Sequence, residues 1–161
     1  MATTAQQAEG KATLPPRWVV RLAWLTHRSI LRVTRGRRGL AMARPDHEGY
    51  LRLRTIGRRS GRERSAILCY VEDGGIFVTL AMNGWAAAEP AWWLNLRGTP
   101  DAIVDLKTGS SRPVHARAAE GEERARLWNL LGQLRGWGAD LDAYERRRGH
   151  ETTVVVFEPR S

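Results

Sequence analysis

Two pairs of short apolar runs, each joined by a glycine-containing turn, constrain the fold of this chain most strongly. Residues 64–72 and 76–81 flank Asp73-Gly74-Gly75, and residues 101–107 and 112–119 flank Thr108-Gly109. Short runs of this kind around such turns predict β-hairpins. Because two strands joined by a hairpin are antiparallel, the chain is expected to contain a largely antiparallel sheet.

Further runs complete the pattern of strands and add helices. Residues 50–56 alternate between apolar and polar side chains, and residues 152–158 contain Val154-Val155-Val156, so both predict strands. Helices are expected at residues 120–135 and 139–147, and a short one lies between Pro90 and Gly98, which suit a helix start and a helix end. This order predicts an α+β fold, a small and mostly antiparallel barrel with inserted helices.

The N-terminal region differs from the rest of the chain. Residues 1–16 are small and polar and predict a disordered tail. Residues 17–34 have a helical pattern whose arginines gather on one face, opposite an apolar face. Two interpretations of this basic helix stay open: it lies in a membrane interface, or it packs its apolar face on the domain's own core. The expected organisation is a tail at 1–16, the helix and its connection at 17–39, and the barrel domain at 40–161.

The excess positive charge is confined to the first part of the chain. Residues 1–64 contain 15 basic and 4 acidic residues, whereas residues 65–161 contain 11 and 13. Such asymmetry indicates an anionic partner, either a membrane surface or a polyanionic small molecule, while no nucleic-acid-binding motif is present. The single cysteine, Cys69, lies in an apolar run and predicts a core residue. With no secretory signal or long apolar segment, the expected location is cytoplasmic, with contact to the inner face of the membrane through residues 17–35 as the open alternative.

The segment from Gly57 to Arg64, hereafter the arginine loop, is the clearest candidate for a binding site. Its sequence is Gly57-Arg58-Arg59-Ser60-Gly61-Arg62-Glu63-Arg64, between two predicted strands. The glycines allow a tight turn, and the arginines and the serine supply charge and hydrogen bonds for a phosphate or a carboxylate. The spacing fits neither a P-loop nor a nucleophile elbow. A charged hairpin loop that binds nothing is the alternative.

Four segments in this order resemble the deazaflavin-dependent nitroreductases, which are split β-barrel proteins related to the FMN-binding pyridoxamine oxidase barrels. They are the arginine loop, residues 76–84, Pro90-Ala91-Trp92-Trp93-Leu94-Asn95-Leu96, and Tyr144 ahead of the last strand. The resemblance covers residues 50–159 and implies a split barrel preceded by the basic helix. It also implies coenzyme F-420, a deazaflavin with a phosphodiester and an oligoglutamate tail, as the cofactor.

The resemblance also implies which residues bind this cofactor. The phosphate and carboxylates would be held by Arg58, Arg59, Ser60, Gly61 and Arg64. The backbone of Ile67, Leu68 and Tyr70 would run beside the deazaflavin ring. The junction of ring and side chain would be contacted by Ala81, Met82, Asn83 and Gly84. Pro90, Trp92 and Asn95 would complete the pocket wall and add amide donors.

The implied reaction is transfer of a hydride from the reduced deazaflavin to an electron-poor acceptor: a quinone, a nitroaromatic or an activated enone. Tyr144 is the expected proton donor or orienting group. The chain departs from the family pattern at Ile67 (usually Pro), Met82 (often Ser), Leu141 (often Tyr) and His150 (Arg). These departures lie mainly in the acceptor site, so the binding inference is stronger than any inference of nitro reduction.

Other functions stay open as alternatives. A related barrel that uses FMN, or that carries F-420 without nitroreductase activity, fits the same motifs, and a non-enzymatic basic membrane-associated module fits the charge. The four histidines are scattered, so no metal site is expected. The run Arg146-Arg147-Arg148 is interpreted as a solvated helix end.

Overall fold

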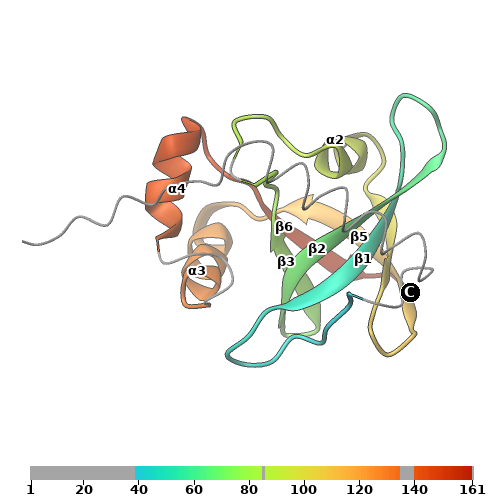
Figure 1. Cartoon of the computed structure of the whole chain (residues 1–161), viewed down its shortest axis with the longest axis horizontal. Helices are drawn as coiled ribbons and strands as arrows, with labels where there is room; N and C mark the ends of the chain where they lie inside the picture. The colour runs from blue at the N-terminus through green and yellow to red at the C-terminus, as the bar shows by residue number, and fades with distance from the viewer. Residues whose placement is uncertain (1–38, 85, 135–139, 161) are drawn as a thin grey trace, which may run out of the picture.

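The computed structural model describes residues 39–84, 86–134 and 140–160. In these residues six strands and three helices follow one another along the chain (Figure 1). The elements are β1 (Gly49–Ile56), β2 (Glu63–Asp73), β3 (Ile76–Leu80), α2 (Ala91–Gly98), β4 (Asp101–Asp105), β5 (Ser111–Ala118), α3 (Gly121–Gly132), α4 (Leu141–Arg148) and β6 (Val154–Pro159). The predicted order of strands and helices from residue 50 onward is therefore confirmed. The predicted tail and basic helix lie outside the described residues.

The strands close into a barrel in the order β1-β2-β3-β6-β5-β4, with every neighbouring pair antiparallel. The two hairpins that the glycine turns predict are β2–β3 and β4–β5. Gly74 and Gly75 both have positive φ, 58° and 88°. Two such residues in a row match the two-residue hairpin turn whose twist fits that of the strands. The α+β barrel expected from the sequence is confirmed.

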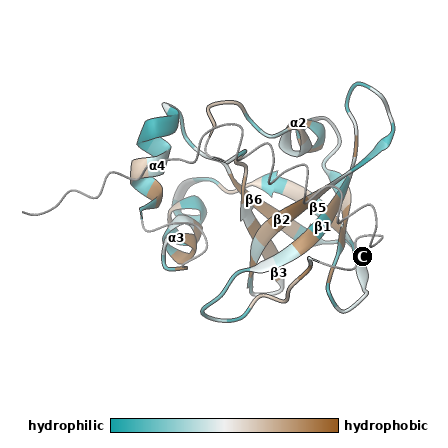
Figure 2. Ribbon diagram, viewed as in Figure 1, coloured by the Kyte–Doolittle hydropathy of each residue, from teal (hydrophilic) through white to brown (hydrophobic). Residues whose placement is uncertain are grey.

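The barrel interior is filled by residues that alternate along the strands. Leu51 and Leu53 of β1 point inward with no exposed area, and Tyr70 and Phe77 meet edge to face with ring centroids 5.4 Å apart. Figure 2 shows the most hydrophobic residues gathered on these strands. Burial of such side chains is the main stabilising contribution to a fold of this kind.

A second apolar cluster lies outside the barrel wall, beneath α3 and α4. Leu127 and Leu131 of α3 and Leu141 of α4 pack there against Val154 and Val156 of β6. The alternate residues of β6, Val155 and Phe157, face the barrel interior instead. Because β6 is covered on both faces, its sequence is continuously apolar rather than alternating.

The short helix α2 covers one end of the barrel, between the arginine loop and the segment that leaves β3 (Figure 1). Trp92, Trp93 and Leu96 bury their side chains in the barrel core. The helices α3 and α4 lie together on one side of the barrel. Among the described helices, none has both the length and the apolar character required to cross a bilayer.

Candidate functional site

The arginine loop is a tight connection between β1 and β2. Gly57 N donates to Arg62 O at 2.8 Å, and Gly61 N donates to Gly57 O at 2.8 Å. Gly61 has φ +62°, in the left-handed region that suits glycine. The backbone of the loop is thus closed by its own hydrogen bonds, and its side chains are left to point outward.

The arginines of this loop are exposed and carry no carboxylate partner. In the parts of the chain that the structure describes, no ion pair involves Arg58, Arg59, Arg62 or Arg64, although Arg54 next to the loop pairs with Glu63 and Asp105. Arg64 donates to Ser60 Oγ at 3.4 Å, which leaves most of its donors available. Within the described residues these four guanidinium groups therefore have no carboxylate partner, and their donors suit an anionic ligand.

Asn95 of α2 fixes the loop from beneath. Its Oδ1 accepts from Arg58 N at 3.1 Å, and its Nδ2 donates to Thr55 Oγ1 at 3.2 Å. Asn95 is 8% exposed. Within the described residues the Asn95 side chain thus binds the loop backbone on one side and β1 on the other, while its contact with a cofactor stays a prediction. In this way Asn95 holds the loop backbone in place.

The two adjacent tryptophans of α2 are both buried. Trp92 and Trp93 are 8% and 7% exposed and contact each other with ring centroids 6.3 Å apart. Pro90 is the N-cap of this helix and is also buried. The two tryptophans pack into the barrel core, and all three residues present little surface of their own.

The predicted ring-contacting strand residues lie on β2. Leu68 and Tyr70 turn their side chains into the barrel core, while Ile67 faces outward and is half-buried. The Tyr70 hydroxyl accepts from Ala43 N at 3.3 Å. Tyr70 is therefore a core residue, and like Leu68 it leaves only its backbone available to a cofactor. Burial raises the pKa of Cys69 to about 12, so its thiol stays protonated and is a poor nucleophile.

The segment that leaves β3 carries four predicted cofactor residues. Ala81 is buried, Met82 is half-buried, and Asn83 and Gly84 are exposed. Figure 1 shows this segment between α4 and α2, with the arginine loop beyond α2. The arginine loop, α2 and residues 81–84 therefore lie at one end of the barrel, with the arginine loop on one side and α4 on the other.

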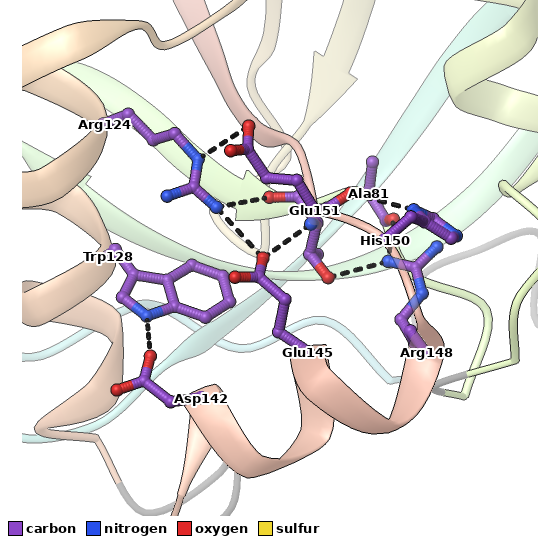
Figure 3. Close-up of polar contacts among 9 residues, drawn as sticks. Ala81, Arg124, Trp128, Asp142, Glu145, Arg148, His150 and Glu151 are labelled. Atoms are coloured by element: carbon purple, nitrogen blue, oxygen red, sulfur yellow. Dashed lines mark hydrogen bonds and ion pairs between the residues drawn. The ribbon is translucent and has the colours of Figure 1, made fainter.

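Tyr144 lies half-buried in α4, and Figure 1 shows α4 on the opposite side of this end of the barrel from the arginine loop. Asp140 caps α4, because its Oδ1 accepts from Ala143 N at 2.8 Å. Further polar contacts of α4, made by Glu145, join it to α3 and to the segment before β6 (Figure 3). The helix is therefore held firmly at both ends.

One member of the arginine run is not solvated. Arg148 is 5% exposed, whereas Arg146 and Arg147 are exposed, so the expectation of a solvated helix end is wrong for Arg148. The reason is helical spacing: Arg148 follows the buried Leu141 by seven residues and shares its face of the helix. That spacing is the signal that sequence reasoning missed.

The described residues do not form a metal-binding cluster at the site. No group of three His, Cys, Asp and Glu side chains is arranged there to bind a metal ion. A depression of about 490 Å³ lies between Pro45–His47 and Leu130–Leu134. None of the residues that line it belongs to the predicted site.

Comparison with known proteins gives the family. The family model described as F420H(2)-dependent quinone reductase matches residues 24–159, which is most of the chain. The chain belongs to this family. The predicted resemblance to deazaflavin-dependent enzymes is confirmed, and the family is named for the reduction of quinones.

Individual relatives agree with this assignment. An enzyme of Mycobacterium tuberculosis with the same description is 31% identical over 137 residues, which cover 83% of this chain and 88% of the relative. A solved F420-H2 dependent reductase matches with a TM-score of 0.60 and 27% identity, over 73% of this chain and 97% of the other. A second solved protein, described as a domain-swapped dimer, has the same TM-score and 25% identity, over 86% and 99% of the two chains.

Proposed function

We propose that this chain holds reduced coenzyme F-420 at the end of the barrel formed by the arginine loop, α2 and residues 81–84, and transfers its hydride to a quinone. As a member of its family the chain is an F-420-dependent oxidoreductase. The same finding disfavours the alternatives of FMN and of a non-enzymatic basic module. The proposal therefore concerns the residues that bind the cofactor and the acceptor that receives the hydride.

The observation that carries the proposal is the set of arginines on the loop that have no carboxylate partner among the described residues. A phosphodiester and several carboxylates need several cationic donors, and Arg58, Arg59 and Arg64 are exposed on a backbone that Asn95 fixes. Charge-assisted hydrogen bonds from preorganised arginines are stronger than neutral ones. The residues present therefore fit the anionic part of coenzyme F-420.

The chemistry of the step belongs to the cofactor, which supplies a hydride when bound in its reduced form. The protein orients the two reactants and excludes water. The arginine loop binds the anionic tail, residues 81–84 lie toward the ring, and the backbone of β2 forms the floor. Reduction of a quinone by hydride also consumes a proton, and we assign its delivery or orientation to the Tyr144 hydroxyl.

A steady-state assay tests this function. Oxidation of reduced F-420 is followed with a water-soluble naphthoquinone, a nitroaromatic and an activated enone as acceptors. The expected result is the highest kcat/KM with the quinone. Equal rates with and without protein for all three acceptors would contradict the proposal.

Removal of one arginine from the loop tests whether the loop binds the cofactor. Arg59→Ala is expected to weaken F-420 binding by about 1–3 kcal/mol, the range of a charge-assisted hydrogen bond. Arg44→Ala is the matched control, because Arg44 is also exposed but lies in the turn before β1. If both substitutions weakened F-420 binding equally, the loop would contribute only through the overall positive charge of the protein and not as a specific binding site.

Membrane association is a second, separate proposal, and the sequence of residues 17–35 supports it. Arginines on one face and apolar residues on the other are typical of a helix that lies in a bilayer interface. An enzyme at that surface would have access to lipophilic quinones. Deletion of residues 1–35 should abolish sedimentation with anionic liposomes and leave F-420 affinity intact, whereas loss of both would mean that this segment belongs to the core.

A further inference from the structure

The guanidinium group of Arg148 lies buried beside the segment that leaves β3. Its Nε donates to Ala86 O at 3.0 Å, and its Nη1 donates to Ala81 O at 3.3 Å and to Thr152 Oγ1 at 2.9 Å. Figure 3 shows Arg148 reaching from the end of α4 toward Ala81. One side chain therefore joins the end of α4, the segment before β6 and the segment after β3.

The two carbonyl groups that Arg148 binds belong to opposite ends of the same short segment. Ala81 and Ala86 enclose Met82, Asn83 and Gly84, which are candidate cofactor residues. Binding both ends at once fixes the span of the segment between them. The planar fork of a guanidinium can do this, whereas the single nitrogen of a lysine cannot reach two separated carbonyls in the same way.

His150 adds a third contact to the same segment. Its Nε2 lies 2.5 Å from Ala87 O, and its Nδ1 lies 2.9 Å from Glu151 O. Unlike Arg148, His150 is exposed. Arg148 and His150, at the end of α4 and just after it, thus contact the carbonyl groups of residues 81, 86 and 87.

This connection is itself braced against α3. Glu145 Oε1 accepts from Thr152 N at 2.6 Å and from Arg124 at 3.0 Å (Figure 3). The Arg124 guanidinium lies 5.1 Å from the centre of the Trp128 ring, and Trp128 donates to Asp142 at 2.7 Å. The end of α4 that carries Arg148 is therefore held in place by these contacts with α3.

Stability alone does not account for an arginine at this position. Burial lowers the pKa of the Arg148 guanidinium, since the charged form is deprived of water. Its buried Nη2 has no hydrogen-bond partner among the described residues. A buried charge that is incompletely paired is a poor source of stability, and an apolar residue of similar size is often as stable or more so.

We propose that Arg148 is a positioning residue: by binding both ends of residues 81–86 it sets the geometry in which this segment presents the deazaflavin ring to the acceptor. This inference rests on the proposed function, because it takes residues 81–84 as part of the cofactor site. The arginine loop beyond α2 sets the affinity for the cofactor, and Arg148 sets the rate of hydride transfer. A displacement of about 1 Å in such a site costs on the order of 100-fold in rate.

The test compares Arg148→Lys with Arg146→Ala, its neighbour on an exposed face of the same helix. For Arg148→Lys we expect kcat with the naphthoquinone to fall about 10- to 100-fold, while the Kd for F-420 stays within about threefold of the wild type. Arg146→Ala should match the wild type in both. Thermal unfolding is recorded for each variant.

Two results would overturn the inference. The first is a wild-type kcat in Arg148→Lys, and the second is a loss of Tm accompanied by equal losses in kcat and in F-420 affinity, which would make the residue merely structural.

If Arg148→Lys does not fold, His150→Ala takes its place, because His150 is exposed and its removal leaves the core intact. It should lower kcat several-fold at unchanged Tm, and an unchanged kcat would refute the inference. Failure of the wild type to bind F-420 at all would instead refute the proposed function.

Discussion

The backbone amide of Arg58 donates to the side chain of Asn95 at 3.1 Å, across 37 residues of sequence. This bond joins the arginine loop to the helix that covers the end of the barrel. Because the same amide side chain also donates to Thr55, Asn95 holds both the end of β1 and the start of the loop. The arginines thus project from a backbone whose position is fixed before a ligand arrives.

Loss of the Asn95 side chain is expected to weaken cofactor binding indirectly, through the position of the arginine loop. Asn95→Ala leaves the Arg58 amide and the Thr55 hydroxyl without a partner, which should lower the free energy of unfolding by about 1–3 kcal/mol. The freed loop should bind F-420 about 10-fold more weakly, because its ordering then costs conformational entropy on binding. Arg97→Ala, an exposed position on the same helix, is the control, and an equal loss of affinity there would contradict this role for Asn95.

The two glycines of the arginine loop should respond differently to substitution. A Cβ at Gly57 would lie 2.9 Å from Ser60 Oγ and 3.2 Å from Arg62 O, so Gly57→Ala must displace the loop. A Cβ at Gly61 meets nothing within 4 Å, and asparagine adopts positive φ more readily than other residues with a side chain. We expect Gly57→Ala to lower F-420 affinity about fivefold or more, a cost of roughly 1 kcal/mol. Gly61→Asn should retain it within about twofold, and the reverse order in a calorimetric titration would contradict the loop geometry.

The carboxylate of Asp105 is expected to make the free energy of unfolding fall in acid. Burial raises the pKa of this carboxyl, but hydrogen bonds from Ser111 and Arg52, with the charges of Arg52 and Arg54, outweigh it and hold the pKa below its usual value. A carboxyl with a lower pKa in the folded state stabilises the fold above its unfolded pKa of about 3.9, and the contribution is lost as the pH falls through the folded pKa.

Asp105→Asn should therefore be less stable than the wild type at pH 7, by about 1–3 kcal/mol. The difference should narrow as the pH falls below about 4, since the wild-type carboxyl is then protonated as well. Thermal unfolding of both proteins between pH 3 and pH 7 measures this. A difference that stays constant over the range would show that the carboxylate charge contributes nothing.

Tyr144 provides a test of the proton step. Tyr144→Phe removes only the hydroxyl, so kcat with a quinone should fall about 100-fold if the hydroxyl acts as the general acid. The Kd for F-420 should not change, because the arginine loop sets it. A wild-type kcat in this variant would exclude Tyr144 from the reaction.

The fold could be predicted from the sequence because its signals are local. The turns at Gly74-Gly75 and Gly109 and the strand patterns beside them fix the hairpins within a few residues of each other. A hairpin needs no information from the rest of the chain. The barrel then follows from the number of strands and the order in which the helices interrupt them.

The roles of Asn95 and Arg148 could not be predicted in this way. Asn95 binds a backbone amide 37 residues away, and Arg148 binds carbonyls 62 and 67 residues away. No local sequence pattern predicts such partners, because almost every residue has a backbone carbonyl and amide. What the sequence did contain was the helical spacing from Leu141 to Arg148, which indicates a shared buried face but not what the arginine would bind.

The most direct test of the account is a parallel titration of the purified protein with F-420 and with FMN, followed through quenching of its seven tryptophans. Trp92 and Trp93 lie in the helix that supports the arginine loop, so a ligand there should alter their emission. We predict saturable quenching by F-420 and little response to FMN, with the F-420 response weakened in Arg59→Ala. A preference for FMN, or an F-420 response unaffected by the loss of Arg59, would contradict the proposed site.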